Sequence, residues 1–359
     1  MDSMGDPDVL RAGVRPLVIL ATTLNFLIIR ALANGPLRLA ELRRATGLPA
    51  QTTLRGHLSS LAALGVVAKR PASEMPYAVE NELTPAGREL LCVAESLEAW
   101  LNRAPEVPLS LETGSGKGVI KAFVDGWGST ILGTLAQRPM SLTELDSVIP
   151  ALSYPALERR LSSMRMAGLV EAAPTTHGSG TPYAVTEWAR QGVAPLVAAG
   201  KCEQLQMQPL AAPVTETDVE AAFMLSVPLV GLPREAAGRC HLTVEGDSAK
   251  GRGRSGVEVI VEAGTVIGCV TDLASEPGQY ATGSPATWFT AVLDARHELL
   301  DYAGGNLPVQ LVHGLHQALV EPLAAAPPPE DSIPPGAEGA QPAAASSAAA
   351  SPTNGTSSS

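Results

Sequence analysis

Apolar residues recur at helical spacing along the first hundred positions of the chain. Leucine and isoleucine at every third or fourth position predict three helices, with turn-forming residues at Asn34–Pro36 and Gly47–Pro49 between them. Two short runs of strand type follow, beginning at Val66 and Tyr77, and predict a hairpin. A fourth helix is expected after Thr84, because threonine is a favoured N-cap residue and the proline that follows it is tolerated in a first turn.

The same pattern occurs again 103 residues further along the chain. Residues 32–67 align with residues 135–170 without a gap, and the inward-facing leucines and the glycine after the third helix coincide. The tetrapeptide Pro-Tyr-Ala-Val then recurs at residues 76–79 and 182–185. The repeat therefore covers a whole domain, and the three residues gained by the second copy fall in the hairpin loop.

The first copy carries strings that are typical of a known family. RLAELRRATG, LRGHLSSLAALGVVAKR and ENELTPAGREL resemble the HxlR-type winged helix-turn-helix regulators, in which a wing and a Leu-Thr-Pro helix start follow the helix-turn-helix. The second copy keeps a recognition-helix start at Ser153 but reads TEWARQG at the later motif. The resemblance implies two tandem, mainly α winged helix-turn-helix domains in a sequence-specific, double-stranded DNA-binding transcription regulator, a repressor more than an activator.

Charge is divided unevenly along a chain whose net charge is −11. From Arg11 to Arg70 there are nine basic residues and one acid, whereas from Glu203 to Asp331 there are six basic and 17 acidic residues. A DNA duplex attracts positive surface, so the basic N-terminal part is the expected DNA-binding part. The second copy is electrically balanced, and we expect it either to bind DNA weakly or to be an internal dimerisation partner.

The expected DNA contacts lie on the third helix of each copy and around it. Gln51 and Arg55, near the start of that helix, are suited to bidentate contacts with adenine and guanine. His57 is either a phosphate contact or a histidine on the helix surface. The other candidates for base, phosphate or minor-groove contacts are Arg38, Arg43, Arg44, Thr52, Thr53, Lys69 and Arg70 in the first copy and Ser153, Arg159 and Arg160 in the second.

After Cys202 the pattern changes to an α+β block. Helices are expected near Thr217, from Pro285 to Arg296 and from Pro308 to Leu319, and strands at Cys240–Glu245, Gly256–Glu262 and Thr265–Thr271. The block weakly resembles a sterol-carrier-protein-type domain, which implies a cavity for a small apolar ligand that controls DNA binding. Trp288 and Phe289 are candidate pocket residues, with packing in the core as the alternative.

These observations predict a multidomain protein. Its parts are a flexible N-terminus (1–15), a winged helix domain (16–103), a linker (104–117), a second winged helix domain (118–203), an α+β domain (204–322) and a disordered, Pro/Ala/Ser-rich tail (323–359). Polar residues interrupt the apolar stretch Pro16–Ala33, so we expect one buried helix there and no membrane span. The N-terminus lacks the pattern of an export signal, which favours the cytoplasm and association with the nucleoid.

The pattern of reactive residues argues against catalysis. The four cysteines are far apart and lack metal-ligand spacing, so we expect buried thiols. We predict no catalytic site, no metal and no cofactor. One alternative to DNA binding stays open, a winged-helix scaffold for protein–protein interaction or dimerisation. For the DNA-binding form, the two half-sites are read either by a homodimer or by a pseudo-dimer within one chain.

Overall fold

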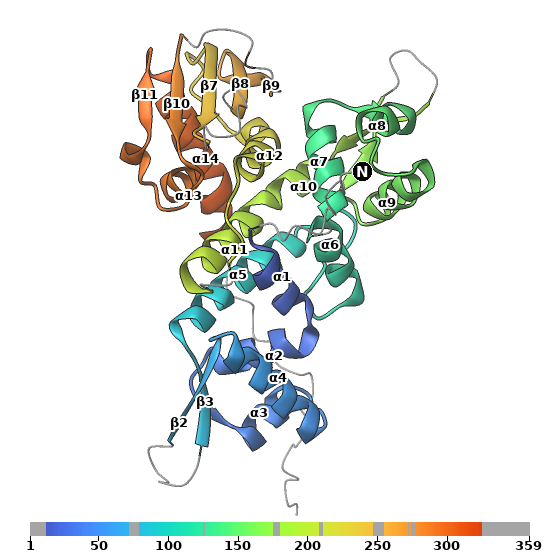
Figure 1. Ribbon diagram of the computed structural model, residues 1–359, viewed down its shortest axis with the longest axis vertical. Coiled ribbons are helices and arrows are strands. Elements are labelled where there is room, and N and C mark those ends of the chain that lie inside the picture. The colour runs from blue at the N-terminus through green and yellow to red at the C-terminus, as the bar shows by residue number, and fades with distance from the viewer. Residues whose placement is uncertain are drawn as a thin grey trace, which may run out of the picture. The chain divides into compact units, whose positions relative to one another are not determined.

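The computed structural model describes residues 12–71, 79–124, 126–174, 180–207, 211–246, 255–271, 273 and 278–324 (Figure 1). Most of the expected flexible N-terminus and nearly all of the expected disordered tail lie outside these ranges. Two boundaries are corrected within them. The first helix begins at Val14, inside the expected flexible segment, and the last helix extends to Ala324, inside the expected tail.

The first repeat, residues 14–101, has the expected three helices, hairpin and closing helix, preceded by one further helix. A two-residue strand that the sequence pattern did not predict pairs with the hairpin and gives an antiparallel sheet in the order β1-β3-β2. In chain order the elements are α1 (Val14–Ala21), α2 (Thr23–Leu32), β1 (Leu37–Arg38), α3 (Leu39–Ala45), α4 (Gln51–Ala63), β2 (Val67–Pro71), β3 (Val79–Leu83) and α5 (Pro85–Leu101).

The apolar stretch Pro16–Ala33 forms two helices where one was expected. Thr22 has extended backbone angles, and the chain bends by 93° between α1 and α2. The bend gives the stretch two sets of partners: α1 packs against α6 and α11, whereas α2 packs against α3, α4 and α5. Among the described residues, no single helix is both long and apolar enough to span a membrane, and α1 and α2 reach that length and composition only as this bent pair.

The second repeat, residues 114–206, has the same order of elements. Its sheet has the order β4-β6-β5, which matches β1-β3-β2 of the first repeat position by position. The one difference in plan is that the closing helix is divided at Gly192. The elements are α6 (Gly114–Val124), α7 (Gly126–Gln137), β4 (Met140–Ser141), α8 (Leu142–Val148), α9 (Tyr154–Met166), β5 (Val170–Ala172), β6 (Pro182–Val185), α10 (Glu187–Gln191) and α11 (Val193–Gln206).

Local geometry repeats as well as element order. Thr84 and Thr186 each cap the closing helix, where the side-chain oxygen accepts a hydrogen bond from the third helical residue at 3.1 Å. Each threonine hydroxyl also donates to the carbonyl of a glycine just after α4 or α9, Gly65 at 2.5 Å and Gly168 at 2.8 Å. Gly65 and Gly168 end those helices with φ of 72° and 73°, values that favour glycine. The second copy has therefore kept the geometry of the helix start although it has lost the Leu-Thr-Pro sequence.

The expected linker at residues 104–117 is partly helical. Helix α6 begins at Gly114, and the Thr113 hydroxyl accepts a hydrogen bond from the Gly116 amide at 3.1 Å. A Cβ atom on Gly116 would lie 2.2 Å from the Ser110 carbonyl oxygen. The glycine-rich composition that predicted a linker is thus explained at this position by close packing of the backbone.

The closing helices of the two repeats pack against each other, as Figure 1 shows for α5 and α11. Trp100 and Trp188 are stacked with ring centroids 4.7 Å apart and an angle of 15° between the rings. Each indole N–H donates to the backbone carbonyl of the other tryptophan, at 2.8 and 3.0 Å. Two buried aromatic rings with satisfied N–H groups bury a large apolar area, so this contact is a major stabilising link between the repeats.

The C-terminal α+β region has a five-stranded sheet in the order β11-β10-β7-β8-β9, in which β7 and β10 are parallel and the other neighbours antiparallel. Helices α12, α13 and α14 pack against the sheet. The three expected strands are present, and β10 and β11 are additional. The elements are α12 (Glu216–Ser226), β7 (Gly238–Val244), β8 (Ser255–Glu262), β9 (Thr265–Val270), β10 (Tyr280–Gly283), α13 (Pro285–Leu293), β11 (Asp301–Ala303) and α14 (Leu307–Ala324).

The buried carboxylate of Glu203 joins the N-terminal end of α1, helix α11 and the segment before α12. Glu203, on α11, is 2% exposed and accepts hydrogen bonds from the backbone N–H of Gly13 at 2.7 Å and of Ala212 at 3.4 Å. The Arg15 Nε lies 3.9 Å from the same carboxylate. A buried charge is costly unless it is paired and hydrogen-bonded, so these three groups fix the start of α1 and the segment before α12 onto α11.

Candidate nucleic-acid interface

Helices α3 and α4 and the turn between them form a helix-turn-helix. Leu42, Leu54 and Leu61 are fully buried beneath the two helices. The turn contains Gly47 and Leu48 with φ of 82° and 59°, and the Leu48 amide donates to the Arg43 carbonyl at 2.8 Å. Because the Arg43 side chain also donates from Nε to the Pro49 carbonyl at 2.8 Å, the turn is held from both sides. This arrangement sets the direction of α4.

The first turns of α4 present polar side chains to solvent. Gln51, Thr52, Thr53 and Arg55 are all exposed, and Gln51 and Arg55, four residues apart, share one face of the helix. The N-cap residue Ala50 has no side-chain acceptor, so the first amide groups of the helix have no side-chain cap. A helix start of this kind attracts anions, and a major groove admits a helix whose exposed side chains reach base edges.

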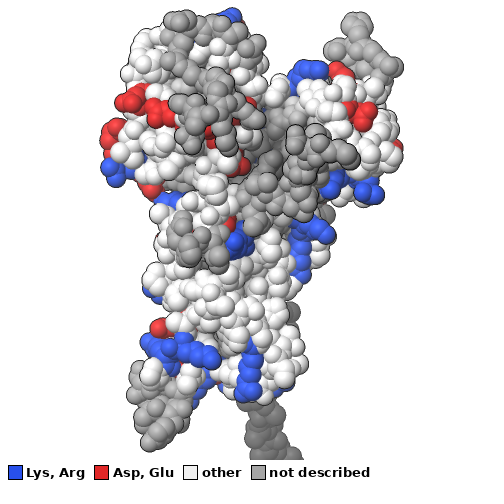
Figure 2. Space-filling model, viewed as in Figure 1, with Lys and Arg blue, Asp and Glu red and all other residues white. Residues whose placement is uncertain are grey.

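Four cations around this helix have no acidic partner among the described residues. Arg43, Arg44, Arg55 and Lys69 are exposed, and the ion pairs of this region involve other arginines. Figure 2 shows Lys and Arg side chains gathered around the base of the β2–β3 hairpin, whereas acidic side chains are concentrated on the α+β region. The uneven distribution of charge along the sequence therefore corresponds to an uneven distribution on the surface.

Arg38 and Arg70, in contrast, form ion pairs with glutamates. Arg70 lies 3.2 Å from Glu80 and 3.5 Å from Glu82, and Arg38 lies 4.0 Å from Glu80. Both glutamates lie on β3, which pairs with β1 and β2. They were not counted in the sequence-based charge of the N-terminal part, because that count ended at Arg70. Since these arginines are 34% and 40% exposed, their ion pairs are weak, but a phosphate would compete with a carboxylate already in place.

His57 corrects the sequence-based expectation, which placed it at a phosphate or on the helix surface. Its Nδ1 is 2.8 Å from the Oδ1 of Asn25, on α2, and the ring is partly buried. The imidazole thus ties the recognition helix to α2 and does not belong to the exposed face. No local sequence pattern predicts this contact, because the two residues are 32 positions apart.

The corresponding face of the second repeat differs in charge. Of its three candidates, Ser153 and Arg159 are exposed and Arg160 is half-buried. At the offset of 103 residues, Arg43 corresponds to Asp146, Arg55 to Glu158 and Lys69 to Ala172. The turn differs too: the residues that correspond to Gly47 and Leu48 are Pro150 and Ala151, and neither has a positive φ. The second repeat therefore keeps the framework of the interface without cations at these positions, although Arg159 provides an exposed one elsewhere on α9.

Residues 19–107 match the HxlR-like helix-turn-helix family. That family is one of DNA-binding transcription regulators and is not an enzyme family. The HxlR-like match begins within α1, includes the helix-turn-helix, the hairpin and α5, and ends before α6. No curated protein matches the chain.

The two candidate pocket residues of the α+β region have different surroundings. Trp288 is 2% exposed, its ring packs edge-on against Phe223 with centroids 4.7 Å apart, and its N–H donates to the Thr243 carbonyl at 2.9 Å. These contacts make Trp288 a core residue, which corrects its placement in a pocket. Phe289, the next residue, is half-buried and lines a small cavity. Its role in ligand binding stays a prediction.

The cysteines are not uniformly buried, contrary to the sequence-based expectation. Burial raises the pKa of Cys202, Cys240 and Cys269 to about 12, so these thiols are protonated at neutral pH. Cys92, on α5, is exposed. Partial burial and the neighbouring carboxylates of Glu95 and Glu89 raise the pKa of the Cys92 thiol as well.

Proposed function

We propose that the protein is a transcription regulator that binds double-stranded DNA in a sequence-specific manner, with α4 of the first repeat as its reading helix. The observation that carries the proposal is the exposed pair Gln51 and Arg55 on one face of α4, near Arg43, Arg44 and Lys69, which form no ion pair within the part of the chain that the structure describes. Arg55 would contact guanine and Gln51 adenine in the major groove. Arg43 and Arg44 would contact phosphates and set the register of the helix on the duplex.

The second repeat is, in this proposal, a second winged helix-turn-helix module that acts as an internal partner of the first. Two features support it: the packing of α5 against α11 and the paired tryptophans Trp100 and Trp188. One chain would then hold the two modules that regulators of this kind usually bring together by dimerisation. Because the residues of the second module that correspond to Arg43, Arg55 and Lys69 are neutral or acidic, we assign specific contacts to the first module.

The proposed biological role follows from the DNA that such a protein would occupy. A regulator that covers promoter DNA prevents transcription, so we propose a repressor associated with the nucleoid. A small apolar ligand bound in the α+β region would control it, since an effector acts through different affinities for two states of the protein.

The test begins with selection of duplexes by the purified full-length chain from random DNA, followed by mobility-shift titration at several salt concentrations. We expect a preferred sequence whose affinity falls steeply with salt because counterions are released from phosphates. Arg55→Ala should relax the preference at one base pair. Arg43→Ala should weaken binding to all duplexes alike and reduce the salt slope by about one.

Arg159→Ala is the matched control, because Arg159 is an exposed arginine in the second repeat. It should leave both affinity and preference nearly unchanged. If no duplex is preferred at low ionic strength, the proposal is wrong. If Arg159→Ala weakens binding as much as Arg55→Ala does, the assignment of the contacts to the first repeat is wrong.

A further inference from the structure

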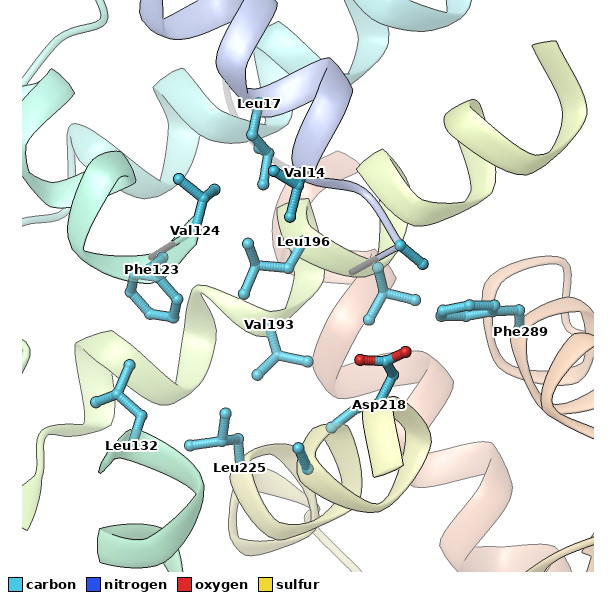
Figure 3. A pocket seen from close by; sticks show the side chains of 14 residues that line it. Val14, Leu17, Phe123, Val124, Leu132, Val193, Leu196, Asp218, Leu225 and Phe289 are labelled. Carbon is cyan, nitrogen blue, oxygen red and sulfur yellow. The ribbon is translucent and has the colours of Figure 1, made fainter. Parts of the chain in front are cut away.

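A small cavity lies where both repeats meet the α+β region. Its volume is about 120 Å³, and its lining comes from six helices, α1, α6, α7, α11, α12 and α13. Figure 3 shows these side chains converging on one space from different parts of the chain. Representative lining residues, one from each helix in that order, are Leu17, Phe123, Leu132, Leu196, Asp218 and Phe289.

The lining is apolar except for one carboxylate. Asp218 is the only charged residue among the described residues that line the cavity. Its Oδ2 accepts hydrogen bonds from the backbone N–H and the hydroxyl of Thr215, at 3.0 and 2.8 Å, in a capping box at the start of α12. Among the described residues its Oδ1 accepts no hydrogen bond and no cation forms an ion pair with it. One carboxylate oxygen is therefore available beside an apolar space.

The size and chemistry of the space restrict what fits it. An apolar cavity of about 150 Å³ holds a benzene ring, so this one is suited to a single ring or a short branched chain. Asp218 is only half-buried, so its carboxylate faces both solvent and the cavity. A purely apolar molecule would not use this carboxylate, whereas a protonated amine would form a charge-assisted hydrogen bond with it. A carboxylic acid of the same size would be repelled.

We propose that this cavity is an effector site for a small apolar molecule that carries a protonated amine. The amine pairs with Oδ1 of Asp218, and the apolar body lies against the apolar lining of the same cavity. An amine of this type is charged at neutral pH, as the side chain of lysine is.

The position of the cavity connects it with the candidate DNA-binding helix. Leu17 is 2% exposed and belongs to α1, which bends at Thr22 into α2. Asn25 of α2 is hydrogen-bonded to His57 of α4. A ligand that changes the packing of α1 would thus act on the orientation of α4 through one bend and one hydrogen bond. This regulatory part of the inference rests on the proposed function, whereas the binding site does not.

The binding test uses benzylamine as the probe, with benzyl alcohol and benzoate as matched compounds, on the full-length protein without DNA. Saturable chemical-shift changes or calorimetric heats should appear for benzylamine, with affinity at least tenfold higher than for benzyl alcohol and no binding of benzoate. Asp218→Asn retains an acceptor for the Thr215 amide but removes the charge, and it should reduce the affinity for benzylamine at least tenfold. Glu216→Gln, on the same helical turn outside the cavity lining, is the control and should have no effect.

A second variant keeps the test decisive if Asp218→Asn unfolds. Ala222→Leu adds three carbon atoms to the lining of the cavity and should abolish binding of both benzylamine and benzyl alcohol. Absence of saturable benzylamine binding to the wild type overturns the site, and so does equal binding by the Ala222→Leu variant. Equal affinity for benzylamine and benzyl alcohol overturns the role of Asp218.

The regulatory part is tested by titrating a selected DNA duplex with and without saturating benzylamine. A change in DNA affinity of threefold or more, absent in Ala222→Leu, supports it. If benzylamine binds without any change in DNA affinity, the effector role is wrong but the binding site still holds. Failure to bind any DNA in the absence of benzylamine contradicts the proposed function instead, so the two failures are distinguishable.

Discussion

The two repeats share one plan and differ where the first presents its cations. Both have the same order of helices and strands, the same threonine cap on the closing helix and the same left-handed glycine after the third helix. Yet Arg43 and Arg55 of the first correspond to Asp146 and Glu158 of the second. Buried leucines and caps thus specify the fold, and the exposed positions are free to carry a different function.

The second repeat uses its polar groups to hold the α+β region. Arg190 donates hydrogen bonds to the carbonyls of Met224 and Leu225 at the end of α12, at 2.9 and 3.4 Å. The corresponding residue of the first repeat, Arg88, donates to Leu83 of its own hairpin at 3.0 Å. Burial lowers the pKa of Arg190, which nevertheless stays positively charged at neutral pH. The same arginine is a local contact in one copy and a contact between regions in the other.

The largest expected effect comes from the contact that joins the two repeats. Trp100→Ala should destabilise the protein by about 3–5 kcal/mol, because it leaves a cavity and removes the indole N–H that donates to the Trp188 carbonyl. Chemical denaturation followed by circular dichroism measures the loss. Trp188→Ala should cost a similar amount and the double variant little more than either, since the two rings stabilise one interface. Full additivity of the two losses would show that the repeats are held together elsewhere.

Exchange of charge between the repeats should have the next largest effect, on DNA binding. Arg55→Glu gives the first repeat the residue of the second and should reduce affinity for the selected duplex about 10- to 100-fold, the value of one bidentate base contact. The converse change, Glu158→Arg, should raise non-specific affinity slightly without restoring specificity in Arg55→Glu. Mobility-shift titration measures both. Restored specificity in the double variant would mean that the two reading helices are interchangeable.

A backbone contact provides a third comparison. A Cβ atom on Gly87 would lie 2.2 Å from the Val66 carbonyl oxygen, whereas the second repeat has the buried Ala189 at the corresponding position. Gly87→Ala should therefore destabilise the protein by about 1–3 kcal/mol, as overpacking does. Ala189→Gly should cost about 1 kcal/mol, through greater freedom of the unfolded backbone. Thermal denaturation of both variants checks the order, and a neutral Gly87→Ala would show that the strand can move aside.

The smallest expected effect concerns pH. Hydrogen bonds from the backbone N–H of Ser141 and from the Arg138 guanidinium lower the pKa of Glu144 to about 2. A carboxylate with a lowered pKa contributes stability that is fully present above about pH 4.5 and is lost as the pH falls toward 2. The stability difference between the wild type and Glu144→Gln should therefore be constant above pH 5 and shrink on acidification. A difference that does not depend on pH would contradict this origin.

Much of the first repeat could be predicted from its sequence because local rules decide it. The spacing of leucines predicted α3 and α4, and the N-cap residue Thr84 predicted the first residue of α5 to within one position. The bend at Thr22 could not be predicted in this way, since it depends on which helices α1 and α2 meet. The strand β1 was missed because two residues carry no periodicity.

The candidate site was less predictable than the fold. Exposure of Gln51, Arg43 and Arg55 followed from helical spacing, but the partners of Arg38, Arg70 and His57 are set by residues that are distant in the sequence. Glu80 and Glu82 of β3 belong to the sequence string ENEL. Pairing this strand with β2 would have predicted that these carboxylates compete with DNA phosphates for Arg70. Trp288 and Phe289 are adjacent aromatic residues of α13, so the sequence pattern does not distinguish them. Which of the two is buried in the core depends on how α13 packs against its neighbours.

Glu203 has a consequence for the order in which the chain acquires its structure during synthesis. Its carboxylate holds the Gly13 amide across a separation of 190 residues. The first helix to leave the ribosome therefore waits for its anchor until more than half of the polypeptide has been made. Until then α1 lacks α11 to cover part of its apolar side, and a nascent chain stalled before α11 should be the species most prone to bind a chaperone.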